Sequence, residues 1–341
     1  MEEILLCTFI KDLKRFKPKP HFLKPAKEHE IKDFKNIDQL INKLEFSKEK
    51  PLTFTEEEKL VAKTFFRTVN FYTFSIYRKL LIGKESYNFS ECLSLYNFDV
   101  FLRENLMKFT GYIELFVKTS FIYNICSVYQ GKLEKADCFL DESLYINRSR
   151  YESILYMLEE RVSKSRTAFM NHHKNKKSYK IPIWVMMEDL TFGEATFFIE
   201  SIVPEIKNEW LNYLVENENL DINLEKNYKK SIFSWIESTR FIRNTCAHHS
   251  RIYGSLLNVN SPKYSTVDMR KLKNEGLKKG DNFTLFARLL AIKNLLVLHS
   301  DRAKIEWNEF LDEFERLIKG NVLIHENYMG LINNWKNYLS I

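Results

Sequence analysis

Residues 98–116 read FDVFLRENLMKFTGYIELF, and this stretch decides the fold class. From Phe98, large apolar residues follow at steps of four, four, three, four and three, ending at Phe116. A helix has about 3.6 residues per turn, so side chains at these steps lie on one side of it as an apolar stripe. The spacing therefore predicts a long amphipathic helix that packs this stripe into a core.

The composition agrees with a helical protein. The 341 residues are 45% hydrophobic and 28% charged, which is enough to bury a core and excludes a disordered chain. The 9 glycines and 7 prolines are far below the roughly 7% and 5% of average usage, so the turns of a sandwich or barrel are poorly provided for. Aromatic residues, at 14%, give the helices bulky rings to pack. We expect an all-α fold.

The net charge and the cysteine content limit the class of binding partner and the cellular compartment that we expect. A net charge of +7 favours an anionic partner, such as RNA, without the strong bias of a protein that coats nucleic acid. The 5 cysteines are odd in number and form no C-x-x-C pair, so neither a disulfide framework nor a zinc site is supported. We therefore expect a reduced, cytoplasmic protein with no metal and no cofactor.

No segment predicts a membrane span. The most apolar stretch, residues 283–298, carries Arg288 and Lys293 in its middle and is shorter than the roughly 20 apolar residues that a span requires. The apolar run at the N-terminus is too short for a secretory signal and is interrupted by Lys11. We expect no membrane partner.

Prolines and polar stretches divide the chain. Pro18, Pro20 and Pro25 cannot lie inside a helix, so residues 1–26 are predicted to form an extended arm. Thr55 precedes three glutamates and is expected to cap a helix that runs to about residue 69. Further helices are predicted near residues 33–44, 151–166, 193–203, 232–246, 283–299 and 305–318.

A basic stretch without any acid lies between residues 161 and 187. We expect a solvated loop here, since most runs of like charge have no binding role. The alternative is a loop that contacts RNA phosphates, because basic side chains release counterions from a nucleic acid; the candidates are Lys174, Lys176, Lys177 and Lys180. The adjacent pair His172-His173 lies in the same stretch and is interpreted as part of the solvated loop.

The candidate chemistry is concentrated in residues 243–253, RNTCAHHSRIY. On a helix that begins at residue 232, one stripe includes Trp235, Thr239 and Cys246, and Arg243 falls within it. A guanidinium is costly to bury alone, so Arg243 is expected to pair with an acid or to line an interface or cleft where an anion binds. Cys246 is interpreted as a packing residue and not as a nucleophile.

Two adjacent histidines follow this arginine. On a regular helix His248 and His249 cannot share its face, so a helix end or a second copy of the chain must bring the groups together. Metal-free RNA cleavage needs a base for the 2′-hydroxyl, an acid for the leaving oxygen and a cation near the phosphorane, which imidazole and guanidinium can supply. The bare spacing carries little weight, because it also occurs between Arg166 and His172.

The surrounding residues are more specific. Residues 243–253 closely resemble the signature of the Abi-like (abortive infection, AbiD/AbiF-type) proteins, a bacterial family of the HEPN superfamily. Other blocks of that family resemble, in the same order, residues 54–58 (FTEEE), 69–72 (VNFY), 95–99 (LYNFD) and 182–193 (PIWVMMEDLTFG). The resemblance covers roughly residues 17–254, and beyond about residue 260 only helical periodicity remains.

This resemblance implies an HEPN-like helical bundle with additional N- and C-terminal helices. The expected division is an arm (1–26), an Abi-like HEPN domain (27–255) and a C-terminal helical extension packed on the bundle (256–341). It also implies a metal-independent ribonuclease that acts in phage defence, usually as a homodimer, and leaves a 2′,3′-cyclic phosphate and a 5′-hydroxyl. Some relatives associate with a small non-coding RNA, so the expected partners are an RNA substrate, such an RNA and a second copy.

Site residues follow from the resemblance one by one. Arg243 and His248 match the arginine and the histidine of the motif, Asn244 matches the polar residue after the arginine, and His249 is the adjacent second histidine. We expect His248, with His249 as an alternate or helper, to transfer protons, Arg243 to stabilise phosphorane charge, and Asn244 to orient the substrate or the partner.

One departure and two rival hypotheses stay open. Where many relatives carry an arginine-bearing segment, this chain has IELFVK at residues 113–118; Glu114 lies off the apolar stripe and is interpreted as a surface or interface residue rather than an acid that supports the site. The first rival is a non-catalytic RNA-binding or scaffold module in which Arg243 satisfies a buried acid. The second is a toxin held inactive by an RNA or protein partner.

Overall fold

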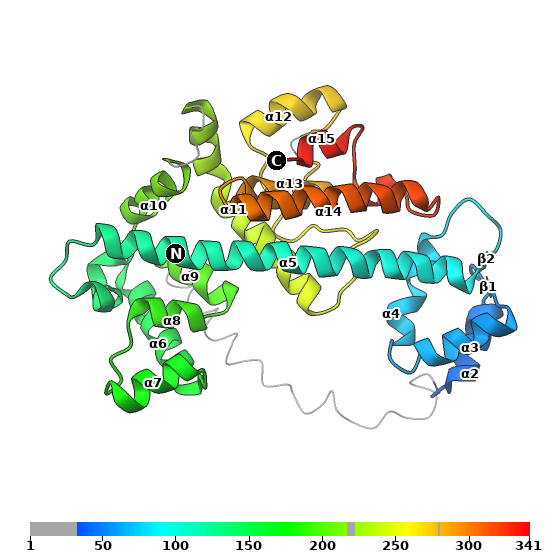
Figure 1. Cartoon of the computed structure of the whole chain (residues 1–341), viewed down its shortest axis with the longest axis horizontal. Coiled ribbons are helices and arrows are strands. Elements are labelled where there is room, and N and C mark those ends of the chain that lie inside the picture. Colours follow the sequence, from blue (N-terminus) through cyan, green and yellow to red (C-terminus); the bar gives the residue numbers. More distant parts are fainter. Residues whose placement is uncertain (1–32, 217–221, 279) are drawn as a thin grey trace.

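The structure, a computed structural model, describes residues 33–216, 222–278 and 280–341, and a single long helix organises it. This helix, α5 (Phe89–Val128), has 40 residues and runs along the molecule (Figure 1). Asn88 caps it and forms a capping box with Glu91. The stripe that begins at Phe98 is buried as far as Ile113, which confirms the predicted amphipathic helix.

Short elements gather at the N-terminal end of α5. They are α2 (Ile37–Glu45), α3 (Glu56–Phe65), α4 (Phe71–Ser75) and the 3-10 turn η2 (Tyr77–Leu80). The predicted cap at Thr55 is confirmed by its capping box with Glu58, although α3 ends before residue 69. Within the described residues the only sheet is a parallel pair of two-residue strands, β1 (Leu52–Thr53) and β2 (Tyr87–Asn88), with Leu52 opposite Tyr87. The fold is all-α, as predicted.

A second group of elements lies at the other end of α5. It comprises η3 (Lys135–Leu140), η4 (Glu142–Leu144), α6 (Arg148–Lys164), α7 (Ala168–Lys176), α8 (Ile183–Asp189) and α9 (Phe192–Ser201). The prediction of a loop between residues 161 and 187 is therefore wrong, because α7 and most of α8 lie in this stretch. The reason is physical: α7 buries only Met170, so it has no apolar stripe that a periodicity could reveal.

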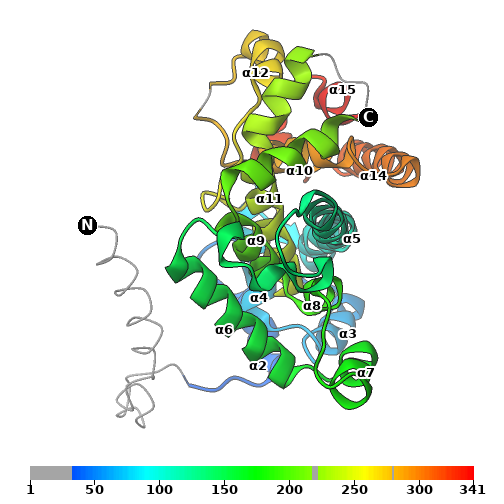
Figure 2. The ribbon, with the colours of Figure 1, turned by 90° about the vertical axis from the view of Figure 1, so that its left-hand side faces the viewer.

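The remaining helices complete the core around α5. They are α10 (Pro204–Glu216), α11 (Ile222–Ala247), α12 (Thr266–Leu272), η5 (Lys273–Glu275), α13 (Leu285–Leu296), α14 (Asp301–Gly320), η6 (Glu326–Met329) and α15 (Trp335–Leu339). Helix α11 packs against both α5 and α13. Figure 2 views α5 nearly end-on and places α14 beside it.

Aromatic rings join the C-terminal helices to α5. Phe109 meets the Trp307 ring edge-on with centroids 5.0 Å apart, and Phe98 stacks on Phe314 at 5.9 Å. Residues after 255 thus share the core of the preceding ones, while the division into domains stays a prediction. The predicted arm, residues 1–26, lies outside the described residues.

None of the helices in residues 33–216, 222–278 and 280–341 combines the length and the apolar character needed to cross a membrane.

Candidate functional site

The sequence motif lies at the C-terminal end of α11, where the helix closes in a defined turn. The amide of His249 donates to the carbonyl of Cys246 at 2.9 Å, and the amide of Ser250 donates to the carbonyl of Thr245 at 3.0 Å. This pair of bonds is the Schellman motif, which requires a left-handed residue just after the helix. His249 occupies that position, with φ at 51°.

A histidine is an unusual choice for the left-handed position. Glycine is most common there, since any Cβ makes the left-handed conformation less stable by about 1 kcal/mol. The chain therefore keeps an imidazole where glycine would give the more stable turn. Such a local conflict between stability and side-chain identity is typical of functional positions.

The turn projects both imidazoles of the motif into solvent. His248 and His249 are exposed, and in the part of the chain that the structure describes neither ring makes a hydrogen bond or an ion pair. The helix end predicted from the sequence does occur here, but within one chain it leaves both rings without a bond to Arg243. Both rings are thus available to exchange protons with a bound molecule.

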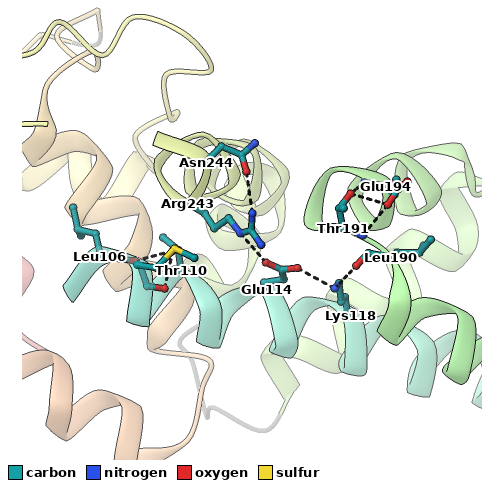
Figure 3. A network of polar contacts seen from close by, with 10 residues as sticks. Leu106, Thr110, Glu114, Lys118, Leu190, Thr191, Glu194, Arg243 and Asn244 are labelled. Atoms are coloured by element: carbon teal, nitrogen blue, oxygen red, sulfur yellow. Dashed lines mark hydrogen bonds and ion pairs between the residues drawn. The ribbon is translucent and has the colours of Figure 1, made fainter. Parts of the chain in front are cut away.

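Arg243 points from α11 toward α5 and forms an ion pair there (Figure 3). Its Nε donates to Oε2 of Glu114 at 3.2 Å, and its Nη1 donates to Oδ1 of Asn244 at 3.4 Å. The side chain of Arg243 is 30% exposed, whereas that of Glu114 is 12% exposed. The expectation that Arg243 pairs with an acid is confirmed, and part of the guanidinium still faces solvent.

The interpretation of Glu114 as a surface or interface residue, rather than an acid that supports the site, is wrong. Its carboxylate is shared by two cations, because Oε1 also accepts an ion pair from Nζ of Lys118 at 2.9 Å. The same ammonium donates to the carbonyl of Leu190 at 2.6 Å (Figure 3). Glu114 lies off the apolar stripe, as predicted, but α11 and the start of α9 cover that side of α5. Only the tertiary contacts make this position part of the site.

Asp99, one of the residues in the family-like block 95–99, is a site-supporting residue that sequence reasoning missed. Its carboxylate is fully buried and accepts hydrogen bonds from the amides of Ile252 at 2.9 Å and Tyr253 at 2.6 Å. It also accepts from the Tyr77 hydroxyl at 2.5 Å and pairs with Arg103 one turn along α5. Asp99 therefore fixes the chain just after the histidine turn. The available signal was an aspartate and an arginine four residues apart beside the apolar stripe.

The loop that follows the motif is held by a buried arginine of α13. Arg288 is fully buried and donates to the carbonyls of Leu257 at 2.7 Å, Val259 at 2.5 Å and Asn260 at 2.5 Å. Its guanidinium also lies 4.9 Å from the centre of the Phe241 ring, on α11. Burial lowers the pKa of Arg288 to about 10. Helix α13 thus holds the loop after the motif and packs its arginine against α11.

The basic candidates lie on and just after α7, away from the histidine turn. Lys176, Lys177 and Lys180 are exposed, whereas Lys174 donates to the carbonyl of Ser165 at 2.8 Å. The other histidine pair belongs to α7 itself and not to a loop, which corrects the expectation for His172 and His173. Nδ1 of His173 lies 2.8 Å from the carbonyl oxygen of Lys180, so that ring closes a turn.

The predicted stripe of α11 is confirmed, including its cysteine. Trp235, Thr239 and Cys246 are buried. Burial raises the pKa of the Cys246 thiol to about 12, which keeps it protonated and unreactive at neutral pH. No cluster of three or more histidine, cysteine, aspartate or glutamate side chains suited to a metal ion occurs in residues 33–216, 222–278 and 280–341.

Comparison with known proteins identifies the family. Residues 64–254, more than half of the chain, match the model of the Abi-like protein family, and the match ends directly after the motif. No curated protein and no solved structure matches the chain. An abortive-infection function is what this family suggests. The matched region includes all of α5, all of α11 and the histidine turn. Because the match covers more than half of the chain, the chain belongs to the Abi-like protein family.

Proposed function

We propose that the chain is a metal-independent endoribonuclease of the HEPN type that acts as an abortive-infection toxin in the cytoplasm. The observation that carries this proposal is the end of α11. Two exposed imidazoles without partners among the described residues follow an arginine whose orientation is set by a carboxylate. Proton transfer and charge stabilisation are the two tasks that RNA cleavage without a metal requires.

The proposed reaction is an attack of the ribose 2′-oxygen on the adjacent phosphorus. His248, with His249 as alternate or helper, accepts the 2′-hydroxyl proton while the O2′–P bond forms. Arg243 stabilises the charge of the phosphorane, and Asn244, which accepts from that guanidinium, orients the substrate. The P–O5′ bond then breaks, and a protonated imidazole donates to the leaving oxygen. The products are a 2′,3′-cyclic phosphate and a 5′-hydroxyl.

A second copy of the chain is part of the proposal. Arg243 turns toward α5, while the imidazoles of the same chain face solvent and make no bond to it. A homodimer that brings two copies of α11 together would supply a nearby imidazole and guanidinium to one phosphate. The exposed lysines at α7 would hold the RNA by its backbone, and a small non-coding RNA is a further candidate partner.

The direct test uses purified full-length protein and end-labelled single-stranded RNA in EDTA. We expect cleavage with cyclic phosphate ends, and a loss of at least a hundredfold for Arg243→Ala and for His248→Ala, in the range of a removed electrostatic or acid–base group. His172→Ala, in the other histidine pair, is the matched control and is expected to retain activity. A requirement for a divalent metal, or cleavage by the Arg243→Ala and His248→Ala double variant, contradicts the mechanism.

The ion pair itself supports a second candidate function. Because Arg243 satisfies the nearly buried Glu114, the chain is alternatively a non-catalytic RNA-binding or scaffold module. That module would bind RNA equally well with and without Arg243 and His248 and would give no cyclic phosphate product. A toxin held inactive by a partner would instead copurify with a protein or a defined RNA after mild lysis and cleave RNA once separated from it.

A further inference from the structure

A pocket of about 510 Å³ is lined in part by Lys118, which shares Glu114 with Arg243, and the proposed reaction does not use it. Its walls come from the C-terminal half of α5, from α8 and from the start of η3. Met187 forms part of its apolar lining, and Lys118, Lys135 and Glu188 supply charged groups. The volume and the mixture of apolar walls with a few polar groups are typical of small-molecule sites.

Two half-exposed aromatic rings flank this pocket. Trp184 on α8 is 49% exposed, and Tyr123 on α5 is 61% exposed. Among the described residues, the Trp184 ring has no aromatic or cationic partner, so its face is available for stacking. Stacking on such a ring contributes about 1–3 kcal/mol per nucleobase in proteins that bind single strands.

The polar groups of the pocket can recognise the edge of a base. Glu188 follows Trp184 by one helical turn, is exposed, and makes no hydrogen bond or ion pair within the described part of the chain. A carboxylate accepts from the amino groups of bases, and unpaired RNA bases offer these groups on their Watson–Crick edge. Lys118 is nearly buried and paired with Glu114, so the exposed Lys135 is the cation of the lining that can meet a phosphate-bearing ligand.

The pocket is connected to the candidate catalytic arginine through shared contacts. Lys118 lines the pocket, and its ammonium lies 2.9 Å from Glu114, which in turn holds Arg243 at 3.2 Å (Figure 3). Glu114 and Lys118 are one turn apart on α5, a rise of about 6 Å. Arg243 and the pocket are thus linked through two side chains one turn apart on α5.

The opposite side of the pocket leads toward the basic helix. Helix α8, which carries Trp184 and Glu188, packs against α7, where the exposed lysines lie (Figure 1). The guanidinium of Arg243, the aromatic pocket and the lysines at α7 are thus three neighbouring features that an RNA strand could contact. A polyanion with flat bases fits this arrangement better than an apolar helix of a partner protein does.

We infer that this pocket holds one unpaired nucleobase of the RNA substrate, stacked on Trp184 and located next to the nucleotide whose phosphate lies at Arg243. The inference deepens the proposed function and rests on it for the identity of the RNA. The pocket positions the substrate, so its loss is expected to weaken RNA binding more than it slows the chemical step.

Cys126 provides a direct readout of occupancy. This thiol lines the pocket, is partly exposed, and has a pKa lowered by a hydrogen bond from Cys138, whereas the other cysteines among the described residues are buried. The full-length protein is treated with iodoacetamide, and alkylation of the Cys126 peptide is followed by mass spectrometry. The four ribonucleoside 5′-monophosphates are the probes, and inorganic phosphate is the control ligand.

We expect at least one nucleotide to slow alkylation several-fold, phosphate to have no effect, and Trp184→Ala to abolish the protection. Trp184→Phe retains an aromatic face and is expected to restore it. In RNA cleavage, Trp184→Ala is expected to raise KM about tenfold with kcat within twofold, in line with one lost stacking contact. Tyr156→Ala, at a tyrosine of α6 that is 69% exposed and does not line the pocket, is the matched control.

Three outcomes overturn the inference: no nucleotide protects Cys126, phosphate alone protects it equally, or Trp184→Ala leaves KM unchanged. If Trp184→Ala instead turns a dimer into a monomer while protection by nucleotides persists, the pocket is an interface between copies. Nucleotide protection in a protein that never cleaves RNA supports the pocket and contradicts the proposed function. Cleavage of RNA by a protein in which no nucleotide protects Cys126 supports the proposed function and contradicts the inferred pocket.

Discussion

Two carboxylates of the same helix, Asp99 and Glu114 of α5, both hold the motif, but they do so in different ways. Asp99 is fully buried and binds the backbone amides of Ile252 and Tyr253. Glu114 is 12% exposed and binds the side chain of Arg243 and that of Lys118. The first carboxylate fixes where the chain goes after the histidine turn, and the second fixes where the guanidinium points.

The difference separates folding from function within one motif. A buried carboxylate that satisfies two amides cannot be removed without leaving those amides unpaired, so Asp99 contributes chiefly to stability. Glu114 is shared between the partly exposed Arg243 and the nearly buried Lys118, so its loss frees the guanidinium and also leaves an ammonium without its carboxylate.

Replacing Asp99 is expected to cause the greatest loss of stability. Asp99→Ala leaves Arg103 and two backbone amides without their buried partner, and we expect the free energy of unfolding to fall by about 3–5 kcal/mol. Chemical denaturation of the full chain measures this value. Asp99→Asn keeps an oxygen for the amides and is expected to lose less. A loss below about 1 kcal/mol for the alanine variant would contradict the role of Asp99 as an anchor.

Replacing Glu114 is expected to affect catalysis more than folding. Glu114→Gln removes the charge that orients Arg243, and we expect kcat for RNA cleavage to fall at least about tenfold, since small misplacements of a catalytic group are costly. The unfolding free energy is expected to fall by less than for Asp99→Ala, because the glutamine keeps a carbonyl oxygen that can accept from the nearly buried Lys118. Glu104→Gln, at an exposed glutamate of the same helix, is the control. Unchanged kcat would show that Glu114 is only a structural partner.

The histidine turn allows a test in which a substitution is expected to increase stability instead of lowering it. His249→Gly removes a side chain from a left-handed position with φ at 51°, so we expect a gain of about 1 kcal/mol in unfolding free energy. The cleavage rate is expected to fall if the ring helps in proton transfer. Ser250→Gly, one residue further on, has no left-handed conformation to relieve and should not stabilise the protein. Equal changes in unfolding free energy for the two substitutions would show that the left-handed conformation of His249 is not strained.

A third carboxylate beside α5 gives the smallest expected effect. Glu306 of α14 pairs with Lys108 at 2.8 Å and accepts from the Tyr112 hydroxyl at 2.8 Å. The hydrogen bond with Lys108, followed by those with Arg302 and Tyr112, lowers the pKa of Glu306 to about 2 from its ordinary value of 4.5. Its contribution to stability is therefore present above about pH 4.5 and is lost as the pH falls toward 2.

Glu306→Gln tests this contribution directly. We expect the variant and the parent chain to differ in unfolding free energy at pH 6, and the difference to shrink as the pH is lowered from 4.5 to 2, because the parent carboxylate becomes protonated there. Denaturant titrations at several pH values measure the two curves. Parallel curves across this interval would mean that the ion pairs of Glu306 do not couple α14 to α5.

Much of the helical content was predictable, because helices leave local patterns. The cap at Thr55, the stripe from Phe98 and the buried face of α11 all follow from spacing and capping, which are properties of neighbouring residues. Helix α7 was missed for the same reason, since its only buried residue is Met170. The ends of most predicted helices were shifted by one to four residues, whereas α11 begins ten residues before the predicted residue 232.

The candidate site was predictable in its residues but not in its arrangement. Arg243, Asn244 and the two histidines are recognisable from the motif, and the pairing of Arg243 with an acid was one of two expected outcomes. The acid itself lies 129 positions away in the sequence, so its identity could not be read from local spacing. The same holds for the contact between Asp99 and the chain after the turn, across 153 positions.

The amino-acid sequence is enough to show that this chain is helical, which faces of its main helices are apolar, and that it carries the Abi-like motif. These are consequences of periodicity and of residue identity within a few turns. Only the tertiary structure decided that Glu114 holds Arg243, that Asp99 fixes the histidine turn, and that the C-terminal helices support both. The physical reason is that a charged side chain beside an apolar stripe has no preferred partner until packing removes water and brings one distant group within hydrogen-bonding range.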